Sequence, residues 1–392
     1  MKRMLRCMAL VLVLALGLSG CGLNKINMTP DTVLGDTLFD EGLLPVKQNG
    51  VWGYVNKKGE VKIRPLYVRV RAFAGSGLAA VYDGAAWGYV GTDGKYVIEP
   101  QFDEAMDFAA GYAAVRVGSK WGYIDVKGKL RVDPQFDSAG DFSAEGCALV
   151  EQNGKYGFIS GSGKFVIKAE YDEARSFAYG YAAVRKGARW NFVNTHGETL
   201  LRKKDMDRVG NFSLNGLAPV QSGGLWGFVN QQGELVIECQ FTQAQGFSVN
   251  GMAAVTLGDG WGYINKDGRL VIPPVYDSAM PFAENVAVVQ KDGRFGLINS
   301  AGEYLAKPVY EDMSVYMNAD RIRAVRDGEA GYLNSSGIDV IPFGFAQMCG
   351  NYFYDDGFTV VKTGGKYGVI NFAGQFVVNP RFDEILFENY EF

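Results

Sequence analysis

The segment Asn49-Gly50-Val51-Trp52-Gly53-Tyr54-Val55-Asn56-Lys57-Lys58-Gly59 carries a Trp-Gly-Tyr motif that returns along the whole chain. Close copies begin at Trp87, Trp121, Trp226 and Trp261, and weaker copies begin at Tyr156, Trp190, Phe295, Ala330 and Tyr367. Successive copies start 34 to 37 residues apart. A fixed period in this range indicates a solenoid, a propeller or an array. The sequence therefore predicts ten copies of one structural unit.

The composition agrees with a body built from short strands. The chain has 392 residues, of which 52 are glycine and 13% are aromatic. Both values favour strands joined by tight turns over long helices. The net charge is −4, and it becomes more negative if the N-terminal residues Lys2, Arg3 and Arg6 are removed. A general nucleic-acid binder needs a basic face, so we expect no nucleic-acid partner.

The N-terminus has the features of an export signal. Lys2, Arg3 and Arg6 precede an apolar run over Met8–Leu18, which is too short to span a bilayer. The run ends in Leu18-Ser19-Gly20-Cys21, which resembles the lipobox of bacterial lipoproteins. That resemblance implies cleavage before Cys21 and a diacylglycerol on its thiol. We therefore expect a lipid anchor at the cell membrane, with the protein facing outside the cytoplasm.

Three segments follow from this interpretation. Residues 1–20 are the predicted lipoprotein signal peptide, residues 21–40 form a polar tether that contains Thr29-Pro30, and residues 41–392 form the repeat domain.

One unit of the repeat is clearest over residues 111–145. Three β-type runs cover 111–116, 120–125 and 129–132, and Asp125-Val126-Lys127-Gly128 between the last two suits a tight hairpin turn. A glycine ends this turn in all ten copies, and we expect each to have a positive φ: Gly59, Gly94, Gly128, Gly163, Gly197, Gly233, Gly268, Gly302, Gly337 and Gly374.

Alternation along the Trp-Gly-Tyr-Ile run predicts which side chains share a face. Trp121 and Tyr123 point to one side, and Gly122 and Ile124 point to the other. We expect the glycine to let a neighbouring aromatic ring approach closely. Aromatic residues about 15 and 21 positions after the tryptophan should fill the space between units. An aspartate after the first of these is predicted to cap one helical turn: Asp103, Asp137, Asp172, Asp277 and Asp383.

Two overall arrangements fit the all-β pattern. The unit is short for a four-stranded propeller blade, which favours an open twisted array of antiparallel hairpins. The alternative is a closed, propeller-like ring. The chain has an extra apolar run at 42–46 before the first tryptophan and ends soon after Phe382-Asp383. If one end of the chain supplied the strand that the repeat at the other end lacks, the two ends would close such a ring.

The recurring Lys-Trp-Gly-Tyr-Ile-Asp-x-x-Gly-Lys-x-Val-Ile-x-Pro-x-Phe-Asp pattern resembles the WG (KWG) repeat family of bacterial proteins. The resemblance covers residues 41 to about 387 and is weakest in repeats five and nine. It implies a β-rich repeat, often on exported or surface proteins, without an enzymatic activity of its own. The family has no agreed catalytic or ligand residues, so the resemblance assigns none here.

Candidate chemical groups are few. His196, the only histidine, lies in a turn where other copies carry varied residues, so we expect it to be exposed. Cys147 takes a slot filled elsewhere by tyrosine, leucine or methionine and is predicted to lie in the core, whereas Cys239 and Cys349 show no metal-binding spacing. The repeated carboxylates give one oxygen donor group per unit, which is too few for calcium. We expect no metal, no cofactor and no catalytic residues.

Two features keep alternatives open. The regularly spaced tryptophans and tyrosines predict an inter-repeat core, with a sugar- or peptide-stacking surface as the alternative. Repeats five and nine depart from the pattern, with Asn191 in place of glycine, Arg202-Lys203-Lys204-Asp205 in place of Pro-x-aromatic, and altered spacing around 342–357. Drift at a tolerant position is the simpler explanation, and a bend or a binding site is the alternative.

The sequence favours a non-enzymatic binding or scaffold module displayed at the bacterial cell envelope, in contact with a protein or a cell-wall polymer. The alternatives are a cell-wall-active enzyme of the glycan hydrolase type and a passive spacer. An enzyme would need a non-repeat segment or a carboxylate pair outside the repeat register, and the sequence contains neither feature. Oligomeric state and the identity of the partner do not follow from the sequence.

Overall fold

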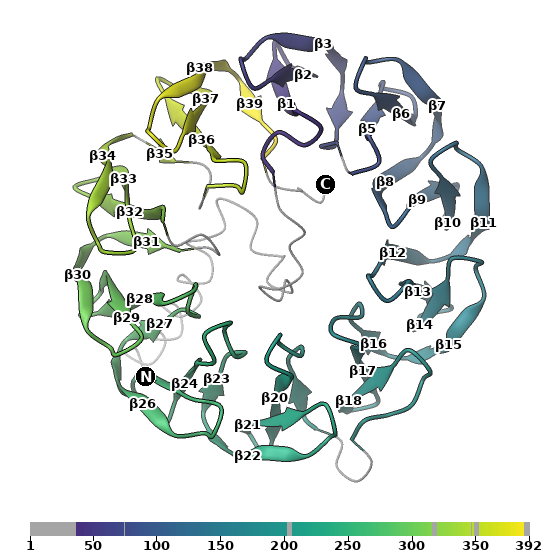
Figure 1. Cartoon of the computed structure of the whole chain (residues 1–392). Coiled ribbons are helices and arrows are strands. Elements are labelled where there is room, and N and C mark those ends of the chain that lie inside the picture. The colour runs from purple at the N-terminus through teal and green to yellow at the C-terminus, as the bar shows by residue number, and fades with distance from the viewer. Residues whose placement is uncertain are drawn as a thin grey trace, which may run out of the picture.

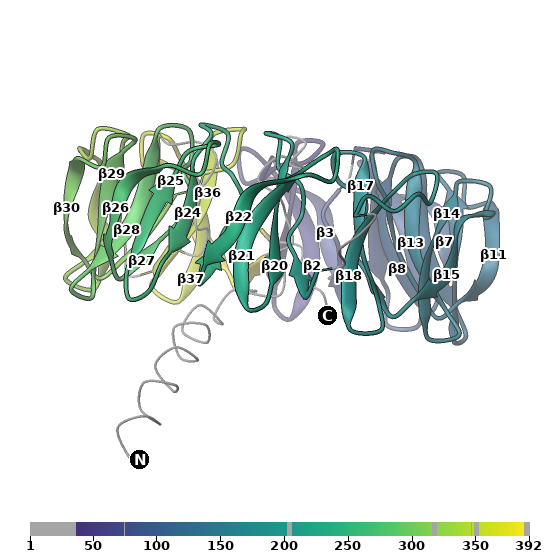
Figure 2. The same cartoon turned by 90° about the horizontal axis from the view of Figure 1, so that it is seen from below.

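The protein is a closed ring of ten small antiparallel sheets (Figure 1). The computed structural model describes residues 37–73, 75–201, 206–315, 320–345, 347–348 and 353–387. These residues form strands and turns, with no helix among them. Figure 2 shows the ring from the side, with the strands running between its two faces. We call each sheet a blade and number the blades from the first Trp-Gly-Tyr motif.

The strands take four positions from the centre of the ring to its rim. The innermost strands are β4 (Arg69–Val70), β8 (Glu104–Ala109), β12 (Ser138–Phe142), β16 (Glu173–Ala174), β19 (Arg208–Val209), β23 (Gln243–Ala244), β27 (Ser278–Ala279), β31 (Asp312–Ser314), β35 (Gln347–Met348) and β39 (Glu384–Ile385). The second strands are β1 (Leu43–Gln48), β5 (Leu78–Tyr82), β9 (Tyr112–Val117), β13 (Cys147–Gln152), β17 (Tyr181–Lys186), β20 (Leu217–Ser222), β24 (Ala253–Thr256), β28 (Val286–Lys291), β32 (Ile322–Arg326) and β36 (Phe358–Thr363).

The third strands carry the Trp-Gly-Tyr motif or its variants. They are β2 (Val51–Asn56), β6 (Trp87–Gly91), β10 (Lys120–Asp125), β14 (Lys155–Ser160), β18 (Arg189–Asn194), β21 (Leu225–Asn230), β25 (Trp261–Ile264), β29 (Arg294–Asn299), β33 (Glu329–Leu333) and β37 (Lys366–Asn371). The outer strands are β3 (Val61–Tyr67), β7 (Tyr96–Phe102), β11 (Leu130–Phe136), β15 (Phe165–Tyr171), β22 (Leu235–Phe241), β26 (Leu270–Tyr276), β30 (Tyr304–Tyr310), β34 (Asp339–Phe345) and β38 (Phe376–Phe382). In blade 5 the described residues form three strands, and isolated bridges join Val193 to Thr199 and Trp190 to Met206 at the outer position.

The two ends of the chain close the ring within blade 1. Strand β39 pairs with β1, with Val46 opposite Ile385 and Lys47 opposite Glu384. The fold is therefore a ten-bladed β-propeller, and the predicted all-β class is confirmed. Of the two arrangements considered, the closed ring is the observed one and the open array is not. A unit of about 35 residues holds four strands because most innermost strands are only two or three residues long.

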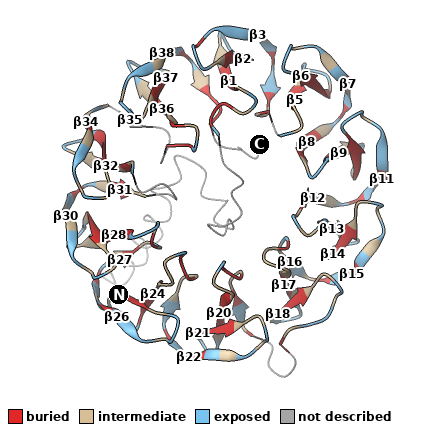
Figure 3. Ribbon diagram, in the orientation of Figure 1, coloured by how far each residue is buried: buried red, intermediate tan, exposed pale blue. Residues whose placement is uncertain are grey.

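The core consists of the apolar layers between neighbouring blades. Trp52 and Tyr54 pack against blade 2, together with Val70 and Phe73, whereas Val55 packs against blade 10. The predicted division of side chains between the two faces of the strand is therefore confirmed. Figure 3 shows buried residues on the second and third strands and exposed residues along the outer strands. Each blade buries its two faces only by stacking on its neighbours.

Aromatic pairs fill the space between blades, as predicted. The rings of Tyr89 in blade 2 and Phe108 in β8 of blade 3 lie 4.9 Å apart. Equivalent pairs join Tyr54 to Phe73, Tyr123 to Phe142, Phe158 to Phe177, Phe192 to Phe212, Phe228 to Phe247, Tyr263 to Phe282 and Tyr332 to Phe353. The Tyr89 hydroxyl also donates to the Met106 carbonyl at 2.7 Å, which satisfies a polar group inside the core.

The glycine of the Trp-Gly motif has a different role from the one predicted. A Cβ atom on Gly53 would lie 2.5 Å from the Ile63 carbonyl oxygen and 2.6 Å from the Pro65 nitrogen. The close neighbour is thus the backbone of the outer strand, and not an aromatic ring. The pairing register shifts here between Trp52 and Tyr54, because the outer strand bulges at the proline.

The turn glycines behave as predicted and also contact the neighbouring blade. All ten have φ between 73° and 81°. An added Cβ on Gly128 would lie 3.0 Å from the side chain of Ile98 in the preceding blade. The position therefore excludes larger residues on two grounds, which explains why it is the most regular one in the sequence.

The ring has two distinct faces. The connection face carries the turns between second and third strands and the links from each outer strand to the next blade. The loop face carries the turns between third and outer strands and the loops between innermost and second strands. Leu38 and Phe39 belong to the predicted tether, and they are buried between blades 10 and 1 on the loop face. Their backbone N–H groups donate to the two Asp356 carboxylate oxygens at 3.2 Å.

Residues 1–36 lie outside the described residues, and so does the predicted lipid attachment site Cys21. Across the described ranges, no helix has the length and apolar character needed to cross a membrane.

Candidate functional site

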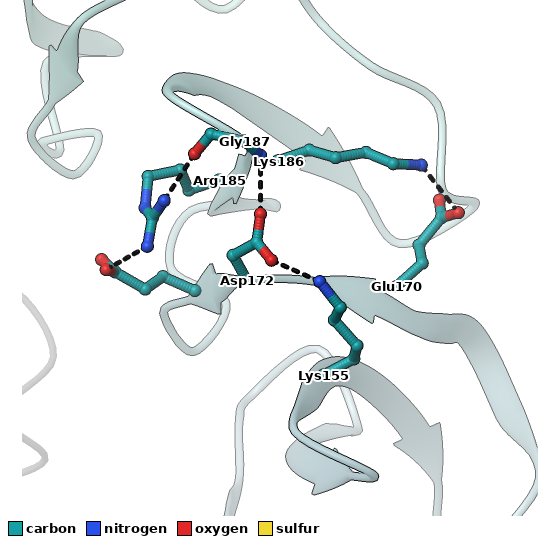
Figure 4. Close-up of polar contacts among 7 residues, drawn as sticks. Lys155, Glu170, Asp172, Arg185, Lys186 and Gly187 are labelled. Carbon is teal, nitrogen blue, oxygen red and sulfur yellow. Dashed lines mark hydrogen bonds and ion pairs between the residues drawn. The ribbon is translucent and has the colours of Figure 1, made fainter.

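A repeated carboxylate on the connection face joins each blade to the next one. Asp172 lies between β15 of blade 4 and β16 of blade 5 (Figure 4). It accepts a hydrogen bond from Lys155 Nζ of blade 4. It accepts another, at 2.6 Å, from the Gly187 N–H in the turn between β17 and β18 of blade 5. We call this three-part contact the carboxylate staple.

The staple recurs around the ring. The turn N–H groups that donate to these carboxylates are Gly118 to Asp103, Asn153 to Asp137, Gly223 to Asp207, Gly293 to Asp277, Gly328 to Glu311 and Asn49 to Asp383. Cations from the preceding blade join in at Lys120, Arg189, Arg294 and Lys366. The prediction that these aspartates cap helical turns is therefore wrong, because the residues after them continue as the next innermost strand.

Electrostatics keep the staple carboxyls ionised. The Lys155 ammonium and the Gly187 N–H lower the pKa of Asp172, and the equivalent partners lower the pKa of Asp137 and Asp383. Hydrogen bonds to the charged form of a carboxyl have this effect. The repeated lysine and aspartate of the motif are therefore engaged in holding blades together.

A hollow on the loop face stands apart from this repeated pattern. It lies between blades 3 and 4, has a volume of about 560 Å³ and is lined by Ala110, Gly111, Tyr112, Asp125, Arg131, Gly161 and Ser162. We call it the Tyr112 hollow. Its volume falls within the range of roughly 300–1,000 Å³ that small-molecule sites occupy.

Three departures from the repeat meet at this hollow. Asp125 stands where seven other repeats have asparagine and the remaining two have Gly91 and Ser160. Arg131 stands where eight of the other repeats have valine or leucine and the first has Lys62. At the position of Gly161 every other repeat has a side chain: Lys57, Thr92, Val126, Thr195, Gln231, Lys266, Ser300, Ser335 and Phe372.

The missing side chain at Gly161 opens the hollow. In blade 6, Gln231 stands at this position beside Tyr181, the equivalent of Tyr112. Its backbone carbonyl oxygen accepts from the Tyr181 hydroxyl at 3.0 Å, and its side-chain amide donates to the Tyr179 carbonyl at 3.2 Å. In blade 4, a Cβ on Gly161 would lie only 2.8 Å from the Tyr112 hydroxyl. The Tyr112 ring therefore borders open space instead of a covering side chain.

Asp125 and Arg131 form the charged wall of the hollow. Arg131 Nε and Nη2 lie 2.8 Å and 2.6 Å from Asp125 Oδ2, and Oδ1 accepts from the Lys127 and Lys129 N–H groups at 2.9 Å and 3.0 Å. Burial by itself raises the pKa of the Asp125 carboxyl, but the hydrogen bonds from Lys129, Lys127 and Arg131 together lower it below its ordinary value. The carboxylate is fully engaged, whereas the arginine side chain is 46% exposed.

The remaining predicted residues have structural surroundings. His196 is exposed in its turn, as predicted. Cys147 is buried, as predicted, and burial raises the pKa of its thiol. Cys239 is half-buried, no disulfide joins it to Cys147, and Cys349 lies outside the described residues. Among the described residues, no three His, Cys, Asp or Glu side chains gather as a metal site would require.

The tryptophans belong to the core and not to a stacking surface. Trp52 and Trp87 are buried, and Trp121, Trp190, Trp226 and Trp261 are half-buried against the neighbouring blades. The first of the two interpretations of this register is therefore correct.

In repeat five a side chain joins the backbone pairing next to the Trp-Gly position. The Asn191 side chain donates to the Leu201 carbonyl and accepts from the Leu201 N–H, both at 3.0 Å, while Trp190 and Met206 pair through their backbones. In repeat nine, residues 346 and 349–352 lie outside the described part of the chain.

Sequence reasoning missed the Tyr112 hollow. The signal was present, because the aligned repeats contain one carboxylate, one arginine and one glycine that no other copy has at those positions. Only the ring geometry places residues from β9, β10, β11 and the turn after β14 around one space.

Comparison with known families agrees with this architecture. A family model described as "WG containing repeat" matches residues 52–84, 87–121, 121–156, 156–190, 192–226, 226–261, 261–295 and 367–391. These matches cover more than half of the chain, so the protein belongs to the WG-repeat family. No curated protein matches the sequence.

Solved structures offer only distant similarity. A eukaryotic initiation factor structure is 10% identical, with a TM-score of 0.48, and the match covers 77% of this chain and 96% of that one. Citrobacter koseri AztD is 12% identical, with a TM-score of 0.33 and coverage of 76% and 92%. Kluyveromyces lactis Hsv2 is 10% identical, with a TM-score of 0.34 and coverage of 49% and 70%. Similarity at this level carries no argument about this protein.

Proposed function

We propose that this protein is a non-enzymatic binding or scaffold module displayed at the bacterial cell envelope and held there by a lipid on Cys21. A repeat β-propeller is consistent with a binding or scaffold module. The observation that carries the proposal is that the residues repeated from blade to blade are structural. The tryptophans, tyrosines and staple aspartates all make contacts between blades. What varies from blade to blade is the exposed surface, and a rigid ring with a variable surface suits recognition.

The position of Leu38 and Phe39 supports a particular orientation. Leu38 and Phe39 are fixed on the loop face by Asp356. Sixteen residues separate Cys21 from Leu38, so the seventeen steps of a fully extended tether span about 60 Å. A lipid on Cys21 would therefore keep the protein within that distance of the membrane, with the loop face attached to the tether. The partner we propose is an envelope protein or a cell-wall polymer.

Membrane fractionation with metabolic labelling by an alkyne fatty acid tests the anchor. The unmodified protein should carry the label and sediment with membranes, and Cys21→Ser should lose both properties. Cys7→Ser is the matched control, because it removes a cysteine from the same signal without touching the attachment site. Labelling that survives in Cys21→Ser would overturn the anchor. Envelope extracts passed over the immobilised Cys21→Ser ring test the binding role, and saturable capture of an envelope component is the expected result.

A further inference from the structure

We propose that the Tyr112 hollow is a binding site for a saccharide. This inference rests on the proposed binding function and names the class of ligand that one part of the ring would take.

The first argument is the coincidence of the three departures. A single unusual residue in a ten-fold repeat is expected from drift. Here Asp125, Arg131 and Gly161 come from two blades, yet they line the same space. Two of them build a charged pair, and the third removes the side chain that would lie against Tyr112. The departures therefore act together to create an accessible polar hollow.

The second argument is the chemistry of the walls. The Tyr112 ring gives an aromatic surface, held in place by the Phe142 ring 4.8 Å away. Arg131 retains N–H groups that Asp125 does not use, and Ser162 and Tyr112 contribute hydroxyls that both donate and accept. A polyhydroxylated ligand with one apolar ring face matches an aromatic surface beside mixed donors and acceptors.

The same walls disfavour other ligands. A peptide that adds a strand needs an open sheet edge. The bordering turns have no such edge, because Gly128 and Gly163 donate to Asp125 and Ser160, and Lys127 and Lys129 donate to the Asp125 side chain. A simple anion would need excess positive charge, but Asp125 neutralises Arg131. These walls therefore favour a neutral or weakly acidic sugar unit as the ligand.

The test measures saccharide binding to the soluble ring, made as the chain from residue 21 with Cys21→Ser. The probes are N-acetylglucosamine tetramer and galacturonic acid tetramer, which distinguish a neutral sugar unit from an acidic one. Saturation-transfer NMR detects contact, and calorimetry gives the dissociation constant. We expect one of the two probes to bind.

Gly161→Gln locates the site. It restores the residue type that repeat six carries at this position, so it should fold, and it fills the hollow. We expect its affinity for the probe to fall at least tenfold. Ser300→Gln introduces the same residue at the equivalent position of blade 8 and should bind as the parent does. Asp125→Asn and Arg131→Val also restore residues found in other repeats, and each should weaken binding.

The outcomes are distinct. If neither probe binds, the saccharide assignment is wrong, whereas the binding role is judged separately by capture from envelope extracts. If a probe binds Gly161→Gln and the parent equally, the site is not the Tyr112 hollow. Loss of binding in Gly161→Gln with retention in Ser300→Gln supports the proposal.

Discussion

At the scale of single residues, the ring depends on a few positions with fixed physical roles. The staple carboxylates illustrate this, since each binds a cation from one blade and a turn N–H from the next. Their pKa values lie below the ordinary value because these partners favour the charged form. The lysine and the aspartate of the motif are visible in the sequence. They lie 17 residues apart, as in Lys120 with Asp137 and Lys155 with Asp172, and only the folded ring brings them into contact.

The staples predict how stability depends on pH. A carboxyl whose pKa is lower in the folded state stabilises the fold above its unfolded value of about 3.9, and this contribution is lost as the pH falls through the folded value. We expect the urea midpoint to be steady at neutral pH and to fall below about pH 4. A variant with Asp137, Asp172 and Asp383 changed to asparagine should show a lower midpoint at pH 7 and a shallower acid loss. Parallel pH profiles for the variant and the parent would contradict this role.

The glycine of the Trp-Gly motif makes a second residue-level prediction. A Cβ on Gly122 would overlap the backbone carbonyl of Val132 and lie 2.8 Å from the Pro134 nitrogen. Gly122→Ala should therefore destabilise the fold by about 1–3 kcal/mol, as other overpacked sites do. Gly246 has open space around its Cβ position, so Gly246→Ala is the control and should change stability by less than about 0.5 kcal/mol. Equal losses in chemical denaturation would show that the close backbone contact is unimportant.

At the scale of strands and blades, the repeat tolerates a departure from the Trp-Gly pattern when a side chain supplies backbone hydrogen bonds. In blade 5 the Asn191 side chain binds both backbone groups of Leu201, and Trp190 still pairs with Met206 through the backbone. The sequence shows that repeat five departs from the common pattern. The contacts of Asn191 favour neither a bend nor a ligand site as the cause of that departure.

Asn191→Ala tests the role of this side chain. It removes the two hydrogen bonds to Leu201 and the one accepted from the Phe192 N–H, worth roughly 0.5–1.5 kcal/mol each, so we expect a loss of about 1.5–4.5 kcal/mol. Hydrogen exchange should accelerate at Leu201 and Phe192 and remain unchanged in blade 8. Protection at Leu201 equal to that of the parent would contradict the assigned role.

At the scale of the whole molecule, the sequence predicted the repeat number, the all-β class and the core aromatics, but it favoured an open array. The reason is physical. The strand that closes the ring has two residues, Glu384 and Ile385, and so short a segment carries no periodicity of its own. The Tyr112 hollow escaped prediction for a related reason, because its residues are ordinary one by one and become a site only when two blades meet.

The seam between blades 10 and 1 is held from both ends of the chain. Asp356 accepts from the Leu38 and Phe39 N–H groups, and its Oδ2 lies 3.4 Å from Lys57 Nζ. Asp356→Ala should leave two backbone donors unpaired and cost about 1–3 kcal/mol. Limited proteolysis should then cut first near residue 38. Asp355→Ala is the neighbouring control. Unchanged cleavage in Asp356→Ala would indicate that the N-terminal contact does not secure the seam.

Closure of the ring is the central claim, and a disulfide between β1 and β39 tests it most directly. Lys47 and Glu384 lie opposite each other in these strands, so Lys47→Cys with Glu384→Cys should form an intramolecular bond under mild oxidation. In a background where Cys21, Cys147, Cys239 and Cys349 are replaced by serine or alanine, we expect one monomeric band that migrates faster without reductant. Lys47→Cys with Glu104→Cys should show no such band. Disulfide-linked oligomers without the fast monomer would mean that the chain is an open array joined end to end.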